Sequence, residues 1–388
     1  MRSVSIIGIG QTKFGEHWDQ GFRDLIVEAG VKAVIDANLQ GKEIQAIYGG
    51  SMANGHLIGQ EHIGALIADQ LGLNPIPSVR CEAACASGAV ALRSGYLDVA
   101  SGAHDVVAVG GAEKMTDVST EDVAMGLGGA GDQEWELFNG ATFPSIFALM
   151  ARRHMFEYGT TEEQLALVAV KNHANAVHNP YAQYQKAITI QDVMESGYVA
   201  SPLKLLDCSP ITDGAAALIL CATEKAKQYS NKPIEILASV QTSDTLALAQ
   251  RQSITESKAT QFAMQDVLKQ AQVTREQIDV LECHDCFTIN QLIALESLGF
   301  CEKGKAGKFI EEGNIDNGGK IPTNMSGGLK AVGHPVGATG VREAIDIVRQ
   351  LRGEMHEKTQ VKDAEIGLTH NVGGSGATVV LHVLKRGF

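Results

Sequence analysis

Two cysteines with a histidine between them lie in the stretch LECHDCFT at 281–288. Cys283 and Cys286 form a C-x-x-C pair that encloses His284 and Asp285. Such a pair can be half of a zinc site, a redox dithiol or part of a catalytic pocket. A zinc ribbon needs a second pair or spaced histidines, and a dithiol needs a thioredoxin-like unit; neither accompanies this stretch. We therefore expect no metal site here.

Cys85 is a candidate nucleophile in EAACASGAVAL, where a predicted strand turns into an alanine-rich helix. At the first turn of a helix, the dipole and the free N–H groups favour a thiolate and can hold an oxyanion. The alternative is a small, inert cysteine buried in a packed helix.

His334 is a candidate base in SGGLKAVGHPVGATG, where it lies between Gly333 and Pro335. Glycines allow a close approach to a ligand, and the proline stiffens the loop. The alternative is an ordinary polar residue of a surface loop. A second glycine-rich turn, in THNVGGSGATVV near the C-terminus, can be a plain hairpin or a backbone site for an anion.

Composition excludes several classes of protein. The chain has 388 residues, 44% of them hydrophobic and 20% charged, which predicts a folded protein of two or three domains. The net charge of −13 argues against a nucleic-acid partner. We expect no membrane span and no signal peptide, because no apolar run is long enough. Seven cysteines without a disulfide-like spacing are typical of the cytoplasm.

The segments that must position Cys85, His334 and the 281–288 stretch follow the strand–helix order of α/β units. Apolar runs without polar alternation, such as VSIIGIG and residues 105–111, predict strands covered on both faces, and residues 22–38 predict a helix. Residues 117–205 change character and predict an insertion packed over this first unit. The second half repeats the strand–helix order with a strand in PIEILASVQTSD and a helix over 258–271. We expect a duplicated α/β unit.

In order along the chain, several motifs resemble those of the thiolase family. They are CASG from Cys85, GGAEKM at 110–115, SPITDGAAALIL at 209–220, HDCF at 284–287, GHPVGATG at 333–340 and the terminal glycine turn. The resemblance is closest to the sterol-carrier-protein-x-type and archaeal thiolases, because HDCF stands where ordinary thiolases have an Asn-Glu-Ala-Phe motif.

The resemblance implies an α/β fold of duplicated βαβαβαββ halves that form a five-layered α-β-α-β-α core with an inserted loop domain. Its boundaries would be 1–116 with 206–230 for the N-terminal half, 117–205 for the loop domain on the CoA-binding side, and 231–388 for the C-terminal half.

The resemblance also implies the catalytic roles. Ordinary thiolases carry a second catalytic cysteine in a C-x-G-G-G stretch, whereas residues 370–374 of this chain read HNVGG. Cys286 would take over proton transfer, and Cys283 would be an ordinary strand residue. Cys85 would attack the thioester with His334 as its base, and His334 and His284 would donate to the enolate oxygen.

The backbone N–H of Cys85 and one from the Gly373–Gly374 turn would form the oxyanion hole of the acyl-enzyme. The CoA phosphates would lie against the insertion, where Arg152, Arg153 and Lys204 are available. Ser209 would lie near the pantetheine arm. No permanently bound cofactor is expected, since coenzyme A thioesters are the substrates.

The expected activity is that of an acetyl-CoA C-acetyltransferase, which converts two acetyl-CoA into acetoacetyl-CoA and CoA, or the reverse, as in the first step of the mevalonate pathway. The alternatives are a 3-ketoacyl-CoA thiolase of longer chains, another condensing enzyme of the hydroxymethylglutaryl-CoA or ketoacyl synthase type, and a non-catalytic scaffold. The resemblance implies a homodimer or homotetramer. It also suggests a complex with hydroxymethylglutaryl-CoA synthase and a small zinc-ribbon/OB protein.

Overall fold

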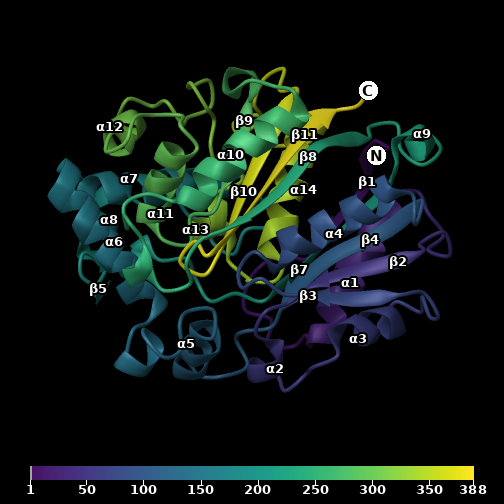
Figure 1. The fold of residues 1–388 in the computed structure, drawn as a ribbon, viewed down its shortest axis with the longest axis horizontal. Coiled ribbons are helices and arrows are strands. Elements are labelled where there is room, and N and C mark those ends of the chain that lie inside the picture. The colour runs from purple at the N-terminus through teal and green to yellow at the C-terminus, as the bar shows by residue number, and fades with distance from the viewer. Residues whose placement is uncertain (1) are drawn as a thin grey trace.

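The computed structural model describes residues 2–388 and contains one large mixed sheet with helices on its faces (Figure 1). The strands of the first half are β1 (Val4–Gln11), β2 (Ala46–Gly50), β3 (Ser78–Cys81), β4 (Val106–Glu113) and β7 (Gly214–Ala222). Those of the second half are β8 (Ile234–Ser243), β9 (Val280–Cys283), β10 (Ile366–Gly373) and β11 (Thr378–Arg386). They pair in the order β3-β2-β4-β7-β1-β8-β11-β10-β9, so β1 and β8 join the halves.

The two halves repeat one strand arrangement. In the first half, β3, β2 and β4 run parallel, and β7 is antiparallel to both β4 and β1. In the second half, β9 and β10 run parallel, and β11 is antiparallel to both β10 and β8. Leu281 of β9 also pairs in parallel with Thr323, where the counterpart of β3 would lie. The predicted duplication of an α/β unit is therefore confirmed.

The long helices form three layers around the two halves of the sheet. The outer side of the first half carries α1 (Phe22–Asp36) and α3 (Ile63–Gln70), the centre holds α4 (Ser87–Ser101) and α14 (Thr339–Arg352), and the outer side of the second half carries α10 (Lys258–Ala271) beside α11 (Thr288–Ser297). Helix α4 packs on β4 and β2, whereas α14 packs on β10 and β9. This is the α-β-α-β-α layering that the resemblance to thiolases implied.

Glycines allow α4 and α14 to approach one another closely. A Cβ atom on Gly88 would lie 2.6 Å from the carbonyl oxygen of Gly337, and one on Gly340 would lie 2.4 Å from the backbone nitrogen of Ala89. Both distances are too short for any side chain. The start of α4 and the loop before α14 therefore lie side by side, which brings Cys85 toward His334.

The insertion contains α5 (Thr120–Gly128), α6 (Phe143–Tyr158), α7 (Glu162–Ala176), α8 (Ile190–Glu195), β5 (Tyr198–Ala200) and β6 (Leu203–Lys204). The prediction that it packs over the first unit holds only for α5, whose Val123 shares a core with Ala53 and Leu57 of the first half. The longer helices pack elsewhere. Apolar residues such as Phe147 and Leu165 share a core with the second half, and α7 contacts α11, α12 and α13. Figure 1 shows α6, α7 and α8 at the left, next to these helices.

The remaining elements are short. The helices are α2 (Asn54–Leu57), α9 (Thr223–Ala226), α12 (Ala306–Glu311) and α13 (Gly328–Val332), and the 3-10 turns are η1 (Leu137–Asn139), η2 (Leu205–Asp207), η3 (Leu248–Gln250) and η4 (Arg275–Gln277). Within residues 2–388, no helix has the length and apolar character needed to cross a bilayer.

Candidate active site

Cys85 lies in a tight turn between β3 and α4. Ala84 adopts a left-handed conformation, with φ of 53°. Ser87 fixes the turn, because its hydroxyl accepts from the N–H of Ala83 at 2.9 Å and donates to the carbonyl of Ala84 at 2.6 Å. The thiol of Cys85 is thus held just ahead of the helix, and the residue is only partly buried.

The structure brings together Cys85, His284 and His334, as the sequence predicted. The sulfur of Cys85 and one ring nitrogen of each histidine lie within 4.8 Å of one another. The two rings meet edge to face, with centroids 5.0 Å apart. The three residues come from the start of α4, the turn after β9 and the loop before α14, so the cluster exists only when both halves are folded.

Thr339 fixes the orientation of the His334 ring. The Thr339 hydroxyl donates to the carbonyl of Pro335 at 3.0 Å, so its oxygen accepts from Nδ1–H of His334 at 2.7 Å. Because Nδ1 carries the proton, Nε2 has a free lone pair. His334 can therefore act as a base through Nε2.

Asn371 gives His284 the opposite tautomer. Its amide Nδ2 donates to Nδ1 of His284 at 3.0 Å, so the proton of this neutral ring lies on Nε2. Nε2 is buried and has no partner among residues 2–388. His284 therefore offers an N–H to a substrate oxygen. Sequence reasoning missed both Thr339 and Asn371, although Asn371 stands next to the glycine turn that it had singled out.

Burial keeps the groups of this cluster neutral. Desolvation lowers the pKa of His334 to about 3 and that of His284 well below its usual value. It also raises the pKa of Cys85 to about 12, although the N–H groups of Gly374 and of Cys85 itself lower it. The N–H groups at the helix start therefore act in the predicted direction, but desolvation outweighs them and the pKa of Cys85 lies above its ordinary value.

Cys286 lies within electrostatic range of Cys85. Burial raises the pKa of Cys286 well above its usual value, and negative charge on Cys85 raises it further. The carbonyl of Cys286 accepts from the backbone N–H of Ser209 at 2.9 Å, so Ser209 also lies beside the cluster. The ring of Phe287 stacks on Phe147 of α6 at 4.6 Å between centroids, which anchors the motif to the insertion.

Asp285 and Cys283, the other residues around the HDCF motif, hold the fold together. Asp285 accepts from the N–H groups of Leu329 and Lys330 at 2.6 and 3.2 Å, which ties the turn after β9 to α13. Asn172 of α7 donates to the same carboxyl group at 2.6 Å. Cys283 is the last residue of β9 and is fully buried, as expected of an ordinary strand residue.

The turn after β10 presents backbone N–H groups to Cys85. A Cβ atom on Gly373 would lie 2.3 Å from the carbonyl oxygen of Ala83, so only glycine fits there. Gly374 has φ of 61°, and its N–H lowers the pKa of Cys85. The two segments of the predicted oxyanion hole, the turn that contains Cys85 and the glycine turn after β10, thus lie side by side.

The three predicted CoA contacts lie in different surroundings. Arg152 lines an open cleft of about 930 Å³, together with Arg153 and the exposed Trp135. Lys204 does not reach this cleft, because it is buried and paired with Glu162. Ser209 lies beside Cys286, as described above.

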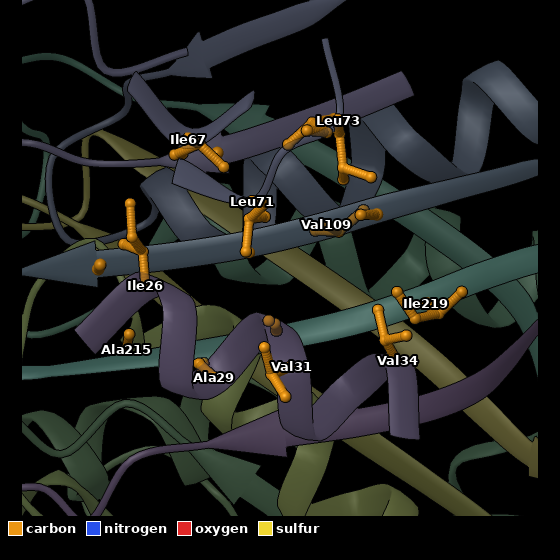
Figure 2. Close-up of a pocket in the computed structure, with 18 of the residues that line it drawn as sticks. Ile26, Ala29, Val31, Val34, Ile67, Leu71, Leu73, Val109, Ala215 and Ile219 are labelled. Carbon is orange, nitrogen blue, oxygen red and sulfur yellow. The ribbon is translucent and has the colours of Figure 1, made fainter. Parts of the chain in front are cut away.

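A second cavity, of about 250 Å³, lies between α1 and α3 over the first half of the sheet (Figure 2). Its labelled side chains are aliphatic, among them Ile26 and Val31 of α1 and Ile67 of α3. Its wall contains no acid, base or thiol. This cavity therefore cannot be the catalytic site.

Two family models match the chain. One is described as the thiolase N-terminal domain and matches residues 4–224. The other is described as thiolase C-terminal domain-like and matches residues 240–386. The chain belongs to the thiolase family.

The relatives of this thiolase agree with the subgroup that its HDCF motif indicated. It is 55% identical to "Acetyl-CoA acetyltransferase" of Methanothermobacter thermautotrophicus over 100% of both chains. It is 34% identical to "Sterol carrier protein 2" of Bos taurus, with 99% of this thiolase and 72% of that protein covered. The solved structure "Ltp2-ChsH2(DUF35) aldolase" is similar to it with a TM-score of 0.83 and 28% identity, over 99% of this chain and 98% of that chain.

Proposed function

We propose that this thiolase is an acetyl-CoA C-acetyltransferase, which joins two acetyl-CoA into acetoacetyl-CoA and CoA and also catalyses the reverse thiolysis. The observation that carries the proposal is the cluster of Cys85, His284 and His334 within 4.8 Å, with Cys286 in electrostatic range. A nucleophile, a base and a neutral N–H donor are the groups that a Claisen reaction through an acyl-enzyme requires.

In the first half-reaction, Cys85 attacks the thioester carbon and its proton passes to Nε2 of His334. The carbonyl oxygen becomes negative and is held by the N–H groups of Cys85 and Gly374. Because burial disfavours a separate thiolate and imidazolium, we propose that the proton moves only as charge develops on this oxygen. Departing CoA takes a proton from Cys286 and leaves as a thiol.

In the second half-reaction, the Cys286 thiolate removes a proton from the methyl group of a second acetyl-CoA. The enolate oxygen accepts from Nε2–H of His284 and from the protonated His334. The enolate carbon attacks acetyl-Cys85, and the Cys85 thiolate that leaves recovers its proton from His334. Each lost oxygen donor costs roughly 10²–10³ in turnover.

We assign the CoA phosphates to Arg152 and Arg153 rather than to Lys204, because the two arginines line the open cleft and Lys204 is held by Glu162. The loop that leads into this cleft reaches the site, since the carbonyl oxygen of Ala130 lies 2.9 Å from a Cβ atom placed on Gly374. The boundaries 117–205 for the loop domain, with the two halves on either side, belong to the same proposal.

The assembly and the pathway are further parts of the proposal. We propose a role at the first step of the mevalonate pathway, in the cytoplasm; the relative from Methanothermobacter thermautotrophicus supports only the acetyltransferase reaction that this step requires. A structural neighbour recorded with a DUF35 protein supports a complex with a second chain, for which hydroxymethylglutaryl-CoA synthase and a small zinc-ribbon/OB protein are the candidates. We also propose a homodimer or homotetramer. Co-purification at moderate salt and mass measurement in solution test these points.

Thiolysis tests the activity directly. The purified chain, mixed with acetoacetyl-CoA and CoA, should remove the enolate absorbance and form two acetyl-CoA. Faster cleavage of longer 3-ketoacyl-CoA would indicate a thiolase of longer chains. A synthase of the related condensing type would leave the absorbance unchanged yet acylate Cys85. A scaffold would show neither cleavage nor acylation.

A further inference from the structure

We propose that Cys85, His284 and His334 form a binding site for Zn²⁺, and that zinc bound there inhibits the enzyme reversibly. The site differs from the C-x-x-C pair that the sequence analysis weighed, because Cys283 takes no part in it. One sulfur and two imidazole nitrogens are a ligand set that Zn²⁺ prefers.

The distances fit with small movements. Zn–S and Zn–N bonds of about 2.3 and 2.0 Å place tetrahedral ligands roughly 3.5 Å apart. The three ligand atoms lie within 4.8 Å of one another. Rotations that move each ring nitrogen and the sulfur by about 1 Å therefore suffice to close the site around the ion.

Neighbouring side chains already orient both imidazoles as in zinc sites, where the second ring nitrogen carries a hydrogen bond. For His334, Thr339 accepts from Nδ1–H at 2.7 Å, which leaves the Nε2 lone pair for the metal. This half of the site needs no rearrangement of protons.

For His284, metal binding through Nε2 requires the proton to move to Nδ1. Acceptors for this proton are in place, because Oδ1 of Asn371 and both carboxyl oxygens of Glu343 are buried and without partners among residues 2–388. Oε1 of Glu343 lies 3.8 Å from Nδ1 of His284. Nε2 of His284, on the other side of the ring, is buried and unpartnered as well. A zinc ion on Nε2 would satisfy that atom, and the proton that moves to Nδ1 would be accepted by Glu343 or by Oδ1 of Asn371.

Binding forms one S–Zn bond and breaks the S–H bond of Cys85, whose proton is released to the solvent. The fourth position remains for water or Cys286, so the ion stays exchangeable. Zinc would occupy the attacking lone pair of Cys85 and the accepting lone pair of His334. The inhibition rests on the proposed function, whereas the binding does not.

Titration with Co²⁺ and Zn²⁺ tests the site. Co²⁺ should give a thiolate charge-transfer band in the near ultraviolet at one ion per chain, and Zn²⁺ should displace it. The band should disappear in Cys85→Ser, and zinc affinity measured by calorimetry should fall at least about tenfold in His284→Gln. Thermal unfolding checks that both variants are folded.

Matched controls exclude other thiols and histidines. Cys301 is a partly buried free thiol. His178 and His356 stack with centroids 4.4 Å apart, so this pair is the control for zinc binding by histidines outside the site. Cys301→Ser and His356→Gln should bind zinc as the wild type does. A band that persists in Cys85→Ser, or binding that is lost in His356→Gln, would overturn the proposal.

Activity separates this proposal from the proposed function. An active enzyme that zinc inhibits and a chelator restores supports both. An inactive chain that still shows the Cys85-dependent band supports the zinc site and contradicts the acetyltransferase. An active enzyme with no stoichiometric zinc or cobalt binding contradicts the site alone.

Discussion

His284 and His334 lie edge to face with ring centroids 5.0 Å apart, and their Nδ1 atoms have opposite hydrogen-bonding roles. His334 donates through Nδ1 to Thr339, and His284 accepts at Nδ1 from Asn371. Nε2 of His334 is therefore a hydrogen-bond acceptor, and Nε2 of His284 is a donor. Two residues of the same type thus perform different tasks, and their neighbours decide which.

Removing the hydroxyl of Thr339 should impair the base. In Thr339→Val, His334 loses the acceptor for Nδ1–H, so the ring can rotate and its Nε2 lone pair is no longer held toward Cys85. We expect the rate of Cys85 acylation by acetyl-CoA to fall about 10²-fold, within the range usual for acid–base groups. Thr339→Ser keeps the hydroxyl and should retain most of the rate. If the acylation rate fell equally in both variants, the loss would come from altered packing at the start of α14 and not from a freed His334 ring.

Reversing the hydrogen bond to His284 should affect the second half-reaction. In Asn371→Asp, a carboxylate can only accept, so the proton of His284 moves to Nδ1 and the enolate oxygen loses a donor. Condensation should fall roughly 10²–10³-fold. Acylation of Cys85 should change far less. Rapid-quench measurement of the two half-reactions separates them, and a parallel decline of both would contradict the assigned tautomer.

Lys330 should make folding stability depend on pH. It is buried in α13, and desolvation lowers its pKa to about 8, an effect that negative charge on Cys208, Asp285 and Asp207 partly offsets. Between that value and the ordinary 10.5, the unfolded chain binds more protons than the folded one, so stability rises with pH over this interval.

Lys330→Met removes this contribution. Relative to the wild type, the variant should gain most in free energy of unfolding at pH 7 and progressively less toward pH 10, by roughly 1.4 kcal/mol for each pKa unit involved. Urea unfolding at several pH values measures the difference. A difference that does not change with pH would mean that Lys330 keeps an ordinary pKa in the folded protein.

The sequence predicted the parts of the fold that apolar runs and repeated order encode. The strands that became β1, β4 and β8 lie in the segments that the sequence analysis singled out, and the two halves follow one order. Strand β2 (AIYGG) was missed, because two of its five residues are glycines and it has too few β-formers to stand out. The side of the insertion was predicted correctly for α5 but wrongly for α6 and α7, since an apolar helix face does not specify which surface it covers.

The candidate site was predictable where a side chain has an unusual local setting. Cys85 stands at a strand–helix turn, His334 between glycine and proline, and Cys286 in a motif of thiolase type. Thr339 and Asn371 could not be found in this way, because they act only through contacts to His334 and His284 across the fold. The raised pKa of the Cys85 thiol could not be predicted from the sequence either, since desolvation depends on tertiary burial.

The central claim is that Cys85 forms the acyl-enzyme and Cys286 carries the proton in carbon–carbon bond formation. The most direct measurement is peptide mass analysis of Cys286→Ala after reaction with acetyl-CoA, together with assay of acetoacetyl-CoA, with Cys283→Ala of the same motif as the control. We predict that Cys286→Ala, which lacks the acid for departing CoA, forms acetyl-Cys85 more slowly but still accumulates it, and makes no acetoacetyl-CoA. Cys283→Ala should make acetoacetyl-CoA as the wild type does. Undiminished acetoacetyl-CoA formation by Cys286→Ala, or acetyl found on any cysteine other than Cys85, would contradict the account.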